Sequence, residues 1–388
     1  MPIQAVQYKI RHLKRHEIEQ LLQLCKAEGR HMGTVAEVET WMQIDPNAFF
    51  VAVNEKDHRI IGSCCGMCLS KTHGYVGMYV VSKEYRGLGI GKQVWSAAIN
   101  HLGTRNQGLS AVSHLFTLYR DKAGFSQVAD WTVDLYRLDY MERMILIHCN
   151  KHQQIKRRKY EKRKNHLMTV MIGDGDGHED VDDADKRRRH EHVEIISSLT
   201  TKECVFCCLG HQYKSKERKY LRQKRMMINM NIILNGQDEQ LIEKVVLYDQ
   251  RLHQYDRSRF VRLTLIEKNC ISRIAVLGQT VVGYGCAKPS LQNMWIMCPL
   301  YADNEYVARM LMIDLISDLI LISQSSTNTI IPSVVLKTPS NNHQACRLLK
   351  ELGFVKQDYS LKRCYTKQVV QVPTQFIYAL HTSVFCTE

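Results

Sequence analysis

Three glycines lie close together between an apolar run and a helical pattern, with a basic residue on each side. They are Gly87, Gly89 and Gly91, flanked by Arg86 and Lys92. A strand that leads into glycines and then into a helix N-terminus forms an anion site, because free backbone N–H groups and the helix dipole point the same way. Glycine also allows positive φ and close approach of the backbone to a phosphate. The segment therefore predicts a phosphate-binding loop.

Two common phosphate motifs do not fit this spacing. A P-loop needs GxxxxGK[ST], whereas Gly87 is only four residues from Gly91 and Gln93 follows Lys92. A dinucleotide fingerprint needs GxGxxG after the first strand, and here GxGxG follows several strands. The pattern that remains is RxxGxG, formed by Arg86, Gly89 and Gly91. A glycine-rich turn without a ligand is the alternative interpretation.

The elements around this loop follow a regular order in the first 140 residues. Apolar alternation predicts strands and helical spacing predicts helices. The expected strands are 3–10, 49–53, 59–69, 75–81, 109–113 and 131–138, and the expected helices are 16–29, 91–103 and 114–125. The loop thus joins a central strand to a helix.

A second cycle of the same kind begins near residue 226. Its expected strands are 226–234, 272–278, 280–288, 293–300, 330–337 and 374–381, and its expected helices are 238–252, 304–323 and 342–354. Between the cycles the charges are segregated into blocks, which indicates a solvated linker. Residues 151–230 hold 20 Lys and Arg against 12 Asp and Glu, so much of the net charge of +14 is local.

The RxxGxG loop, the order of elements and "LYRDKAGF" with its Gly124–Phe125 ending resemble the GNAT superfamily of N-acetyltransferases over residues 1–140. The resemblance implies an acetyl-CoA loop at this place. It would place the strand backbone beside the pantetheine arm at Tyr79, Val80 and Val81. It also implies that the pyrophosphate is bound by Arg86 and by the backbone amides of Gly87, Leu88, Gly89, Ile90, Gly91 and Lys92.

The same resemblance bears on catalysis. It implies that Tyr119 protonates the departing thiolate, with a half-buried helix tyrosine as the alternative interpretation. For the base that accepts a proton from the amine, the sequence offers His114, Glu84 and Ser113 without a decision, and water could serve instead.

The second cycle resembles a YitH/HolE-type GNAT-like domain, but its loop differs. Residues 301–305 (YADNE) contain no glycine pair and no arginine, and acidic side chains there would cap a helix and repel a pyrophosphate. Leu349 stands where the tyrosine is expected. We therefore expect weak or altered cofactor binding in this half, which would shape the acceptor site or mediate association. A second acyl-CoA site is the alternative.

The predicted fold is α/β with a mixed sheet, as two tandem GNAT-like folds joined by a long charged linker. The expected domains are 1–145, 146–225 and 226–388. The predicted function is transfer of an acetyl group from acetyl-CoA to a primary amine, on a small molecule or on a protein lysine or N-terminus. The alternatives are a non-catalytic acyl-CoA sensor and a nucleic-acid-binding protein that acts through the basic linker.

Composition limits the other classes. No apolar run approaches the roughly 18 residues that span a bilayer, and no signal peptide is visible, so we expect no membrane partner and a cytoplasmic or nuclear location. Fourteen scattered cysteines predict free thiols. In the expected strand 59–69, Cys64 and Cys68 face one side and Cys65 faces the other. The three thiols therefore cannot converge on one site, and we expect them to be core thiols. We expect no metal, including at the cluster of Cys204, Cys207, Cys208 and His211, and no calcium at the acidic run 174–185.

Overall fold

The computed structural model describes residues 6–29, 33–139, 228–233, 238–253, 255–325 and 333–381. The chain divides into one compact unit of residues 1–139, 228–315 and 330–388 and a second of residues 140–227 and 316–329. Only the last part of one helix is described in the second unit. The charged segment 146–225, with its cysteine cluster and acidic run, lies outside the described residues.

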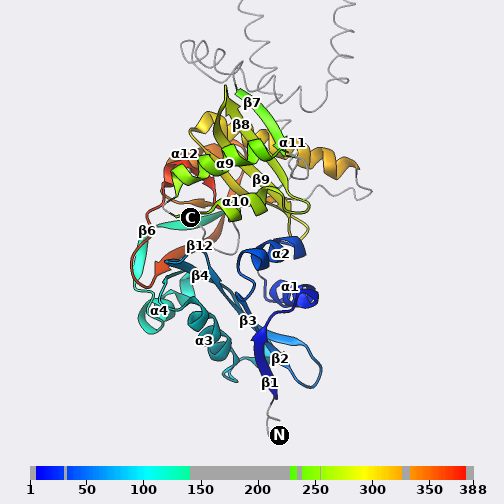
Figure 1. The fold of residues 1–388 in the computed structure, drawn as a ribbon, viewed down its shortest axis with the longest axis vertical. Coiled ribbons are helices and arrows are strands. Elements are labelled where there is room, and N and C mark those ends of the chain that lie inside the picture. The colour runs from blue at the N-terminus through cyan, green and yellow to red at the C-terminus, as the bar shows by residue number, and fades with distance from the viewer. Residues whose placement is uncertain are drawn as a thin grey trace, which may run out of the picture. The chain divides into compact units, whose positions relative to one another are not determined.

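The first half of the larger unit, up to residue 139, follows the predicted order with one additional helix. Its elements are β1 (Tyr8–His12), α1 (Ile18–Ala27), α2 (Val35–Ile44), β2 (Phe49–Asn54), β3 (Ile60–Cys68), β4 (His73–Val81), α3 (Ile90–Leu102), β5 (Asn106–Val112), α4 (Ser113–Lys122) and β6 (Gln127–Leu138). Figure 1 shows α1 and α2 on one side of β2–β4, and α3 and α4 on the other.

The second half, from residue 228, repeats this order. Its elements are β7 (Ile228–Ile233), α9 (Glu239–Leu252), α10 (Ser258–Leu265), β8 (Ile271–Leu277), β9 (Thr280–Pro289), β10 (Trp295–Ala302), α11 (Glu305–Ser325), β11 (Val334–Pro339), α12 (His343–Glu351), β12 (Val355–Tyr365) and β13 (Ile377–Ala379). Helices α9 and α10 cover β8 and β9 (Figure 1). None of the described helices is both long enough and apolar enough to cross a membrane.

One mixed sheet runs through both halves, in the order β1-β2-β3-β4-β5-β12-β6-β11-β10-β9-β8-β7. The prediction of a mixed α/β fold is therefore confirmed, but the two halves exchange strands. Strand β12 pairs antiparallel with β5, with Leu361 opposite Val112, and β6 pairs antiparallel with β11, with Leu138 opposite Val334. Each half therefore completes its sheet with a strand from the other half.

Helix α2 and helix α10 join the halves on one face. The rings of Trp41 and Phe260 lie 4.8 Å apart. Beside them the buried Lys288 ammonium lies 3.0 Å from Glu37 and 3.3 Å from Glu267. A buried charge is stable only when it is paired in this way, so these side chains fix the halves to each other.

Candidate active site

The predicted loop leaves β4 and enters α3 through two glycines with positive φ. Gly87 has φ +83° and Gly89, the N-cap of α3, has φ +78°. A Cβ built on either glycine would meet no atom within 4 Å, so backbone conformation, not crowding, requires glycine there. The first amides of α3 have no carbonyl one turn earlier in the helix to bind, and the space in front of them is open. This geometry suits an anion.

The third glycine has a different role. A Cβ on Gly91 would lie 2.6 Å from the Tyr79 hydroxyl oxygen. Tyr79 comes from β4, and its ring packs edge-on against Trp95 of α3 at 5.4 Å. Burial raises the pKa of Tyr79, so its hydroxyl remains neutral. Gly91 therefore allows the start of α3 to approach β4 closely.

Strands β4 and β5 separate beside this loop. They pair in parallel from His73 opposite Asn106 to Val76 opposite Leu109, although β4 continues to Val81. Just beyond the last pair, Met78 has φ +48° in a β-bulge against β3. A bulge increases twist and bends the strand away from its neighbour. The strand edge from Tyr79 to Val81 thus borders an opening.

This opening is a cavity of about 460 Å³. It brings together nine of the ten predicted cofactor residues; only Leu88, which is 37% exposed, is not in its lining. The lining residues are Tyr79, Val80, Val81, Tyr85, Arg86, Gly87, Gly89, Ile90, Gly91, Lys92, His114 and Leu115. The sequence pattern therefore located the cavity, and α4 supplies its remaining wall.

Arg86 is held across the loop by Glu28, which no sequence motif singles out. Its guanidinium forms an ion pair with Glu28, at the end of α1, and its Nε donates to the Val81 carbonyl at 3.1 Å. The second Glu28 oxygen accepts a hydrogen bond from the Lys83 amide at 3.0 Å. Glu28 thus orients Arg86 and partly balances its charge.

The candidate catalytic residues are in different environments. Tyr119 is buried, 9% exposed, its ring stacks on Trp95 at 5.5 Å, and it is not among the residues that line the cavity. Of the three candidate bases, His114 lines the cavity, whereas the exposed Glu84 and Ser113 do not. His114 is therefore the ionisable side chain that α4 contributes to the wall.

Tyr119 and Leu349 occupy corresponding places in the two halves. The Tyr119 carbonyl accepts a hydrogen bond from the Phe125 amide at 3.1 Å, and the Leu349 carbonyl accepts one from the Phe354 amide at 2.9 Å. Both bonds close a helix that ends in Gly-Phe. The second half therefore has an apolar side chain where the first has a hydroxyl.

The corresponding opening in the second half is filled by the chain itself. Strands β10 and β11 pair only at Trp295–Val334 and Ile296–Val335 and then separate. Strand β13 pairs with β10 beyond this point, with Leu300 opposite Ala379. On its other side the Leu380 amide donates to the Lys337 carbonyl of β11 at 2.8 Å. The last described strand thus occupies the crevice.

A buried polar network holds the end of this strand. Arg257 donates to His381 Nδ1 at 2.5 Å, and His381 Nε2 lies 3.0 Å from the Thr264 hydroxyl. Arg257 also pairs with Asp249 at 3.2 Å. Burial, reinforced by the charge of Arg257, lowers the pKa of His381 well below its usual value. The imidazole is therefore neutral, and its Nδ1 can accept the hydrogen bond from Arg257.

The loop of the second half is used for helix capping. The Asn304 side chain accepts a hydrogen bond from the Val307 amide at 3.1 Å. Glu305 forms ion pairs with Arg309 at 3.1 Å and Arg347 at 2.6 Å. The start of α11 therefore presents a bound carboxylate instead of an open glycine turn.

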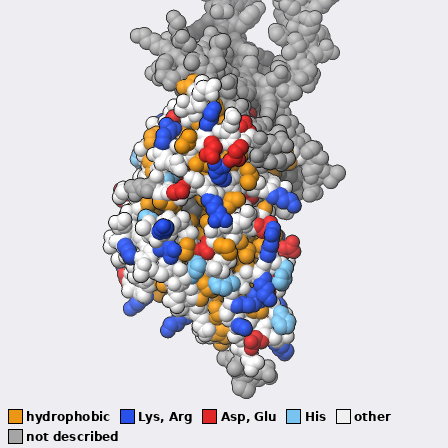
Figure 2. Space-filling view, viewed as in Figure 1, with side chains coloured by type: hydrophobic (Ala, Val, Ile, Leu, Met, Phe, Trp, Pro, Cys, Tyr) orange, Lys and Arg blue, Asp and Glu red, His pale blue; other side chains and the backbone are white. Residues whose placement is uncertain are grey.

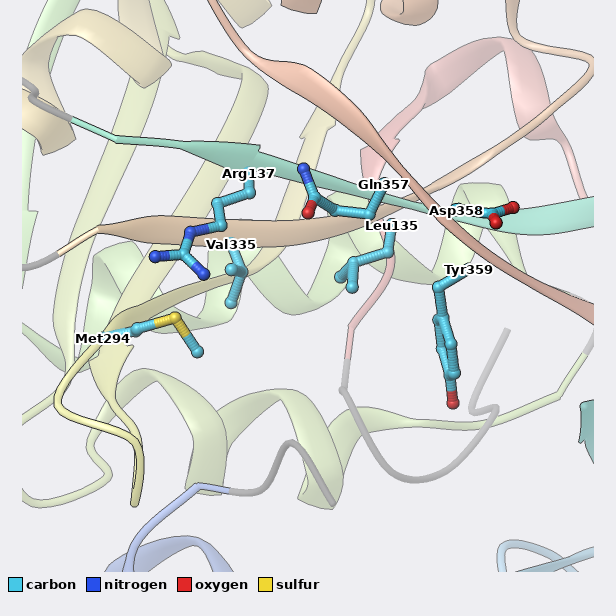
Figure 3. Close-up of a pocket in the computed structure, with 7 residues that line it drawn as sticks. All are labelled: Leu135, Arg137, Met294, Val335, Gln357, Asp358 and Tyr359. Atoms are coloured by element: carbon cyan, nitrogen blue, oxygen red, sulfur yellow. The ribbon is translucent and has the colours of Figure 1, made fainter. Parts of the chain in front are cut away.

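A separate hollow of about 270 Å³ lies where β6, β11 and β12 meet (Figure 3). It arises from a bulge in β12, where Gln357, Asp358 and Tyr359 are inserted opposite β6. Arg137, the cation in its lining, pairs with Asp139 at 2.7 Å and donates to Ser333 at 3.1 Å. Its charge is thus already balanced.

Comparisons with known proteins agree with this architecture. Residues 15–123 match a model described as the acetyltransferase (GNAT) family, and residues 245–379 match one described as an acetyltransferase (GNAT) domain. No curated protein is significantly similar to the chain in sequence.

Three solved structures illustrate the similarity of fold. A candidate acetyltransferase from Pyrococcus horikoshii gives a TM-score of 0.57 at 14% identity, over 99% of this chain and 96% of its own. A tandem GNAT protein from the clavulanic acid biosynthesis pathway gives 0.51 at 11%, over 93% and 99%. The N-myristoyltransferase of Saccharomyces cerevisiae, solved with myristoyl-CoA, gives 0.51 at 9%, over 98% and 90%.

Proposed function

Because this chain carries two GNAT domains in tandem and is an acyltransferase, we propose that it transfers an acetyl group from acetyl-CoA to a primary amine at one site in its first half. The observation that supports this proposal most directly is the cavity at the loop of Arg86 to Lys92, where β4 and β5 separate. We place the domains at 1–145 and 226–388, with 146–225 as the linker.

The residues of the cavity suit the parts of acetyl-CoA. The amides from Gly87 to Lys92, with Arg86 and Lys92, would bind the pyrophosphate at the N-terminus of α3. Beyond its last pair with β5, the edge of β4 from Tyr79 to Val81 would hydrogen bond to the amides of the pantetheine arm. A backbone N–H near Val81 would polarise the thioester carbonyl, where negative charge develops during attack.

Direct transfer needs few further groups. The amine nitrogen bonds to the acetyl carbon, the carbon–sulfur bond breaks, and the amine loses a proton while the thiolate gains one. We assign protonation of the thiolate to Tyr119. His114, in the cavity wall, or water would accept the proton of the amine. Most of the rate enhancement would come from positioning.

The second half would not take acetyl-CoA, because β13 lies in the crevice between β10 and β11 and Glu305 lies at the start of α11. A bound pantetheine would have to displace β13. We therefore expect one acetyl-CoA per chain.

Calorimetric titration with acetyl-CoA tests the proposal. Native protein should bind one equivalent with micromolar affinity, and Gly89→Glu should abolish binding because it adds an acid where the pyrophosphate would lie. Gly278→Glu is the matched control, since Gly278 also has a positive φ, +62°, and open space around it, but lies in the β8–β9 turn. Absence of binding by the native chain would contradict the proposal.

Turnover separates an enzyme from a non-catalytic acyl-CoA sensor. Thiol release from acetyl-CoA should accelerate with a suitable amine, which could be a small molecule, a lysine side chain or a protein N-terminus. Binding without turnover over all three acceptor classes would favour the sensor.

The face in Figure 2 shows Lys and Arg dispersed among acidic and apolar side chains, so it gives no support to a nucleic-acid surface there. We propose a cytoplasmic or nuclear location.

A further inference from the structure

Three side chains with metal-ligand chemistry converge at the edge of the first half, away from the glycine loop. Asp45 follows α2, Cys68 is the last residue of β3, and His101 lies in the last turn of α3. One ligand atom from each side chain lies within 4.8 Å of the others. The three residues come from three different elements, so only the fold brings them together.

These side chains are hydrogen-bonded to one another, and the Cys68 amide also donates to Asp45 Oδ2 at 2.9 Å, so an ion would take the place of the contact between Asp45 and His101. Asp45 Oδ2 lies 2.8 Å from His101 Nε2. The thiol of Cys68 makes a long contact of 3.8 Å to the His101 carbonyl. Tetrahedral zinc binds nitrogen and oxygen at about 2.0 Å and sulfur at about 2.3 Å, so its ligands are separated by about 3 to 4 Å. Small side-chain rotations would place all three atoms at these distances.

The ligands are held by their surroundings. The Asn47 amide donates to Asp45 Oδ1 at 3.2 Å, which fixes the carboxylate. The His101 ring packs edge-on against Phe50 at 5.8 Å. A hydrogen bond that orients a carboxylate, such as the one from the Asn47 amide, is typical of metal sites. Asp45 is buried, whereas Cys68 and His101 are partly exposed, so an ion and a water ligand could reach the group from solvent.

We propose that Asp45, Cys68 and His101 bind a zinc ion, with water as the fourth ligand. The donor set of one oxygen, one sulfur and one nitrogen suits Zn²⁺ and does not suit Mg²⁺ or Ca²⁺, which prefer oxygen. On binding, the hydrogen bond between His101 Nε2 and Asp45 Oδ2 breaks, and the imidazole keeps its proton on Nδ1 so that Nε2 can bind the ion. The sulfur–hydrogen bond of Cys68 also breaks, a zinc–sulfur bond forms, and the thiol proton passes to solvent. The thiolate and carboxylate balance the charge of the ion.

The position of the group indicates what the ion does. Helix α3 has 13 residues, which span roughly 20 Å at about 1.5 Å per residue, and the cavity lies at its other end. The ion would therefore join the ends of α2, β3 and α3 and take no part in acyl transfer. The guanidinium of nearby Arg105 donates to the carbonyls of Ser70 and Leu102, at 2.8 and 3.0 Å.

Cobalt titration of the full metal-free chain tests this proposal. A cobalt-bound thiolate has a charge-transfer absorption in the near ultraviolet, which should reach saturation in the native chain. Cys68→Ser should bind one cobalt fewer per chain and lose the matching part of this absorption, and His101→Gln should weaken binding at least tenfold. Cys346→Ser is the matched control, because Cys346 is a partly buried cysteine of α12 outside the group.

Thermal unfolding gives an independent measure. Added zinc should raise the Tm of the native chain and of Cys346→Ser, and should not raise that of Cys68→Ser, because a ligand stabilises only a protein that binds it. Equal cobalt stoichiometry in native protein and Cys68→Ser would overturn the proposal, since any bound metal would then lie at other cysteines. Neither measurement depends on acetyl-CoA, so the two proposals can fail separately.

Discussion

At the scale of single residues, the cavity combines a backbone shaped by positive-φ glycines with a few charged side chains. Arg86 is one of these charges, and it is 56% exposed at the side chain and paired with Glu28. Exposed ion pairs contribute little to folding. Replacing Arg86 should therefore weaken the binding of acetyl-CoA and hardly change the free energy of unfolding.

Replacing Arg86 by alanine tests this separation. We expect the Kd for acetyl-CoA to rise about 5- to 20-fold, because a charge-assisted hydrogen bond contributes about 1 to 2 kcal/mol. The free energy of unfolding should change by less than about 1 kcal/mol. Calorimetry and urea denaturation measure the two quantities. Arg120→Ala, which breaks an exposed pair with Asp121, should change neither.

The hydroxyl of Tyr119 can be removed without removing its ring. In Tyr119→Phe the stacking on Trp95 is kept, so the Kd for acetyl-CoA should remain within about twofold. Loss of a proton donor should lower kcat by about 10- to 100-fold. Steady-state kinetics with a fixed amine gives kcat. A kcat within twofold of the native value would assign protonation of the thiolate to another group.

At the scale of elements, the closed crevice depends on Asn342. Its side chain caps α12 by accepting from the Ala345 amide at 2.9 Å. Its amide also donates to the carbonyls of Thr374 at 2.8 Å and Ile377 at 2.9 Å, on the segment that enters β13. One side chain thus holds both a helix and the strand that fills the crevice.

We expect Asn342→Ala to lower the free energy of unfolding by about 2 to 4 kcal/mol, because it leaves buried carbonyls without their donor and removes a cap. Asn304→Ala is the matched control. Asn304 caps α11 in the same way, so its loss should cost about 1 kcal/mol. Urea denaturation of both variants gives the comparison. Equal losses of unfolding free energy in the two variants would show that the hydrogen bonds from Asn342 to the Thr374 and Ile377 carbonyls contribute nothing to stability.

The neutral His381 makes stability depend on pH. Its folded-state pKa lies below the value of about 6.5 in the unfolded chain, so below about pH 6.5 the unfolded chain binds a proton that the folded chain does not. This contribution is fully present above about pH 6.5 and is lost as the pH falls toward the folded-state pKa. The slope reaches about 1.4 kcal/mol per pH unit.

Denaturation measured from pH 7.5 to 5 should therefore show a smaller slope in His381→Gln than in the native chain. The variant His16→Gln, at an exposed position, should keep the native slope. An unchanged slope in His381→Gln would mean that other groups cause the loss of stability in acid.

The sequence predicted most elements because their apolar periods are clear, and it located the cavity because positive-φ glycines leave a visible pattern. It did not predict α2, α10 or β12. Strand β12 (VKQDYSLKRCY) shows no apolar alternation, and its buried Arg363 stacks over the Trp131 ring, so its burial pattern cannot be read from hydrophobicity. The prediction of core thiols is confirmed for Cys64 and Cys65, whereas Cys68 is partly exposed and lies beside Asp45 and His101.

At the scale of the whole molecule, the exchanged strands make the halves interdependent. Strand β5 has β12 as its neighbour, and β6 lies between β12 and β11. A fragment of residues 1–145 would leave β5 and β6 without these partners, and unpaired strand edges aggregate. The resemblance of each half to a GNAT domain could not reveal this, because the pairing joins residues far apart in the chain.

We expect the fragment 1–145 to be insoluble or unfolded when produced alone, and to be recovered folded when it is produced together with 226–388. Co-purification and circular dichroism measure the two outcomes. A full chain cut by protease within 146–225 should remain associated through the β5–β12 and β6–β11 pairs. A stable, folded fragment 1–145 would contradict this dependence.

The exchange also sets a delay during synthesis. Asn106, at the start of β5, donates a hydrogen bond to Gln368, which is 262 residues later in the chain. At about 5 to 20 residues per second, a ribosome needs roughly 13 to 50 s to make that interval. During this time the first half has its glycine loop but lacks the strand that completes its sheet. The protein should therefore depend on chaperones while it is translated, and premature termination near residue 350 should yield a chain that is degraded although its cofactor loop is complete.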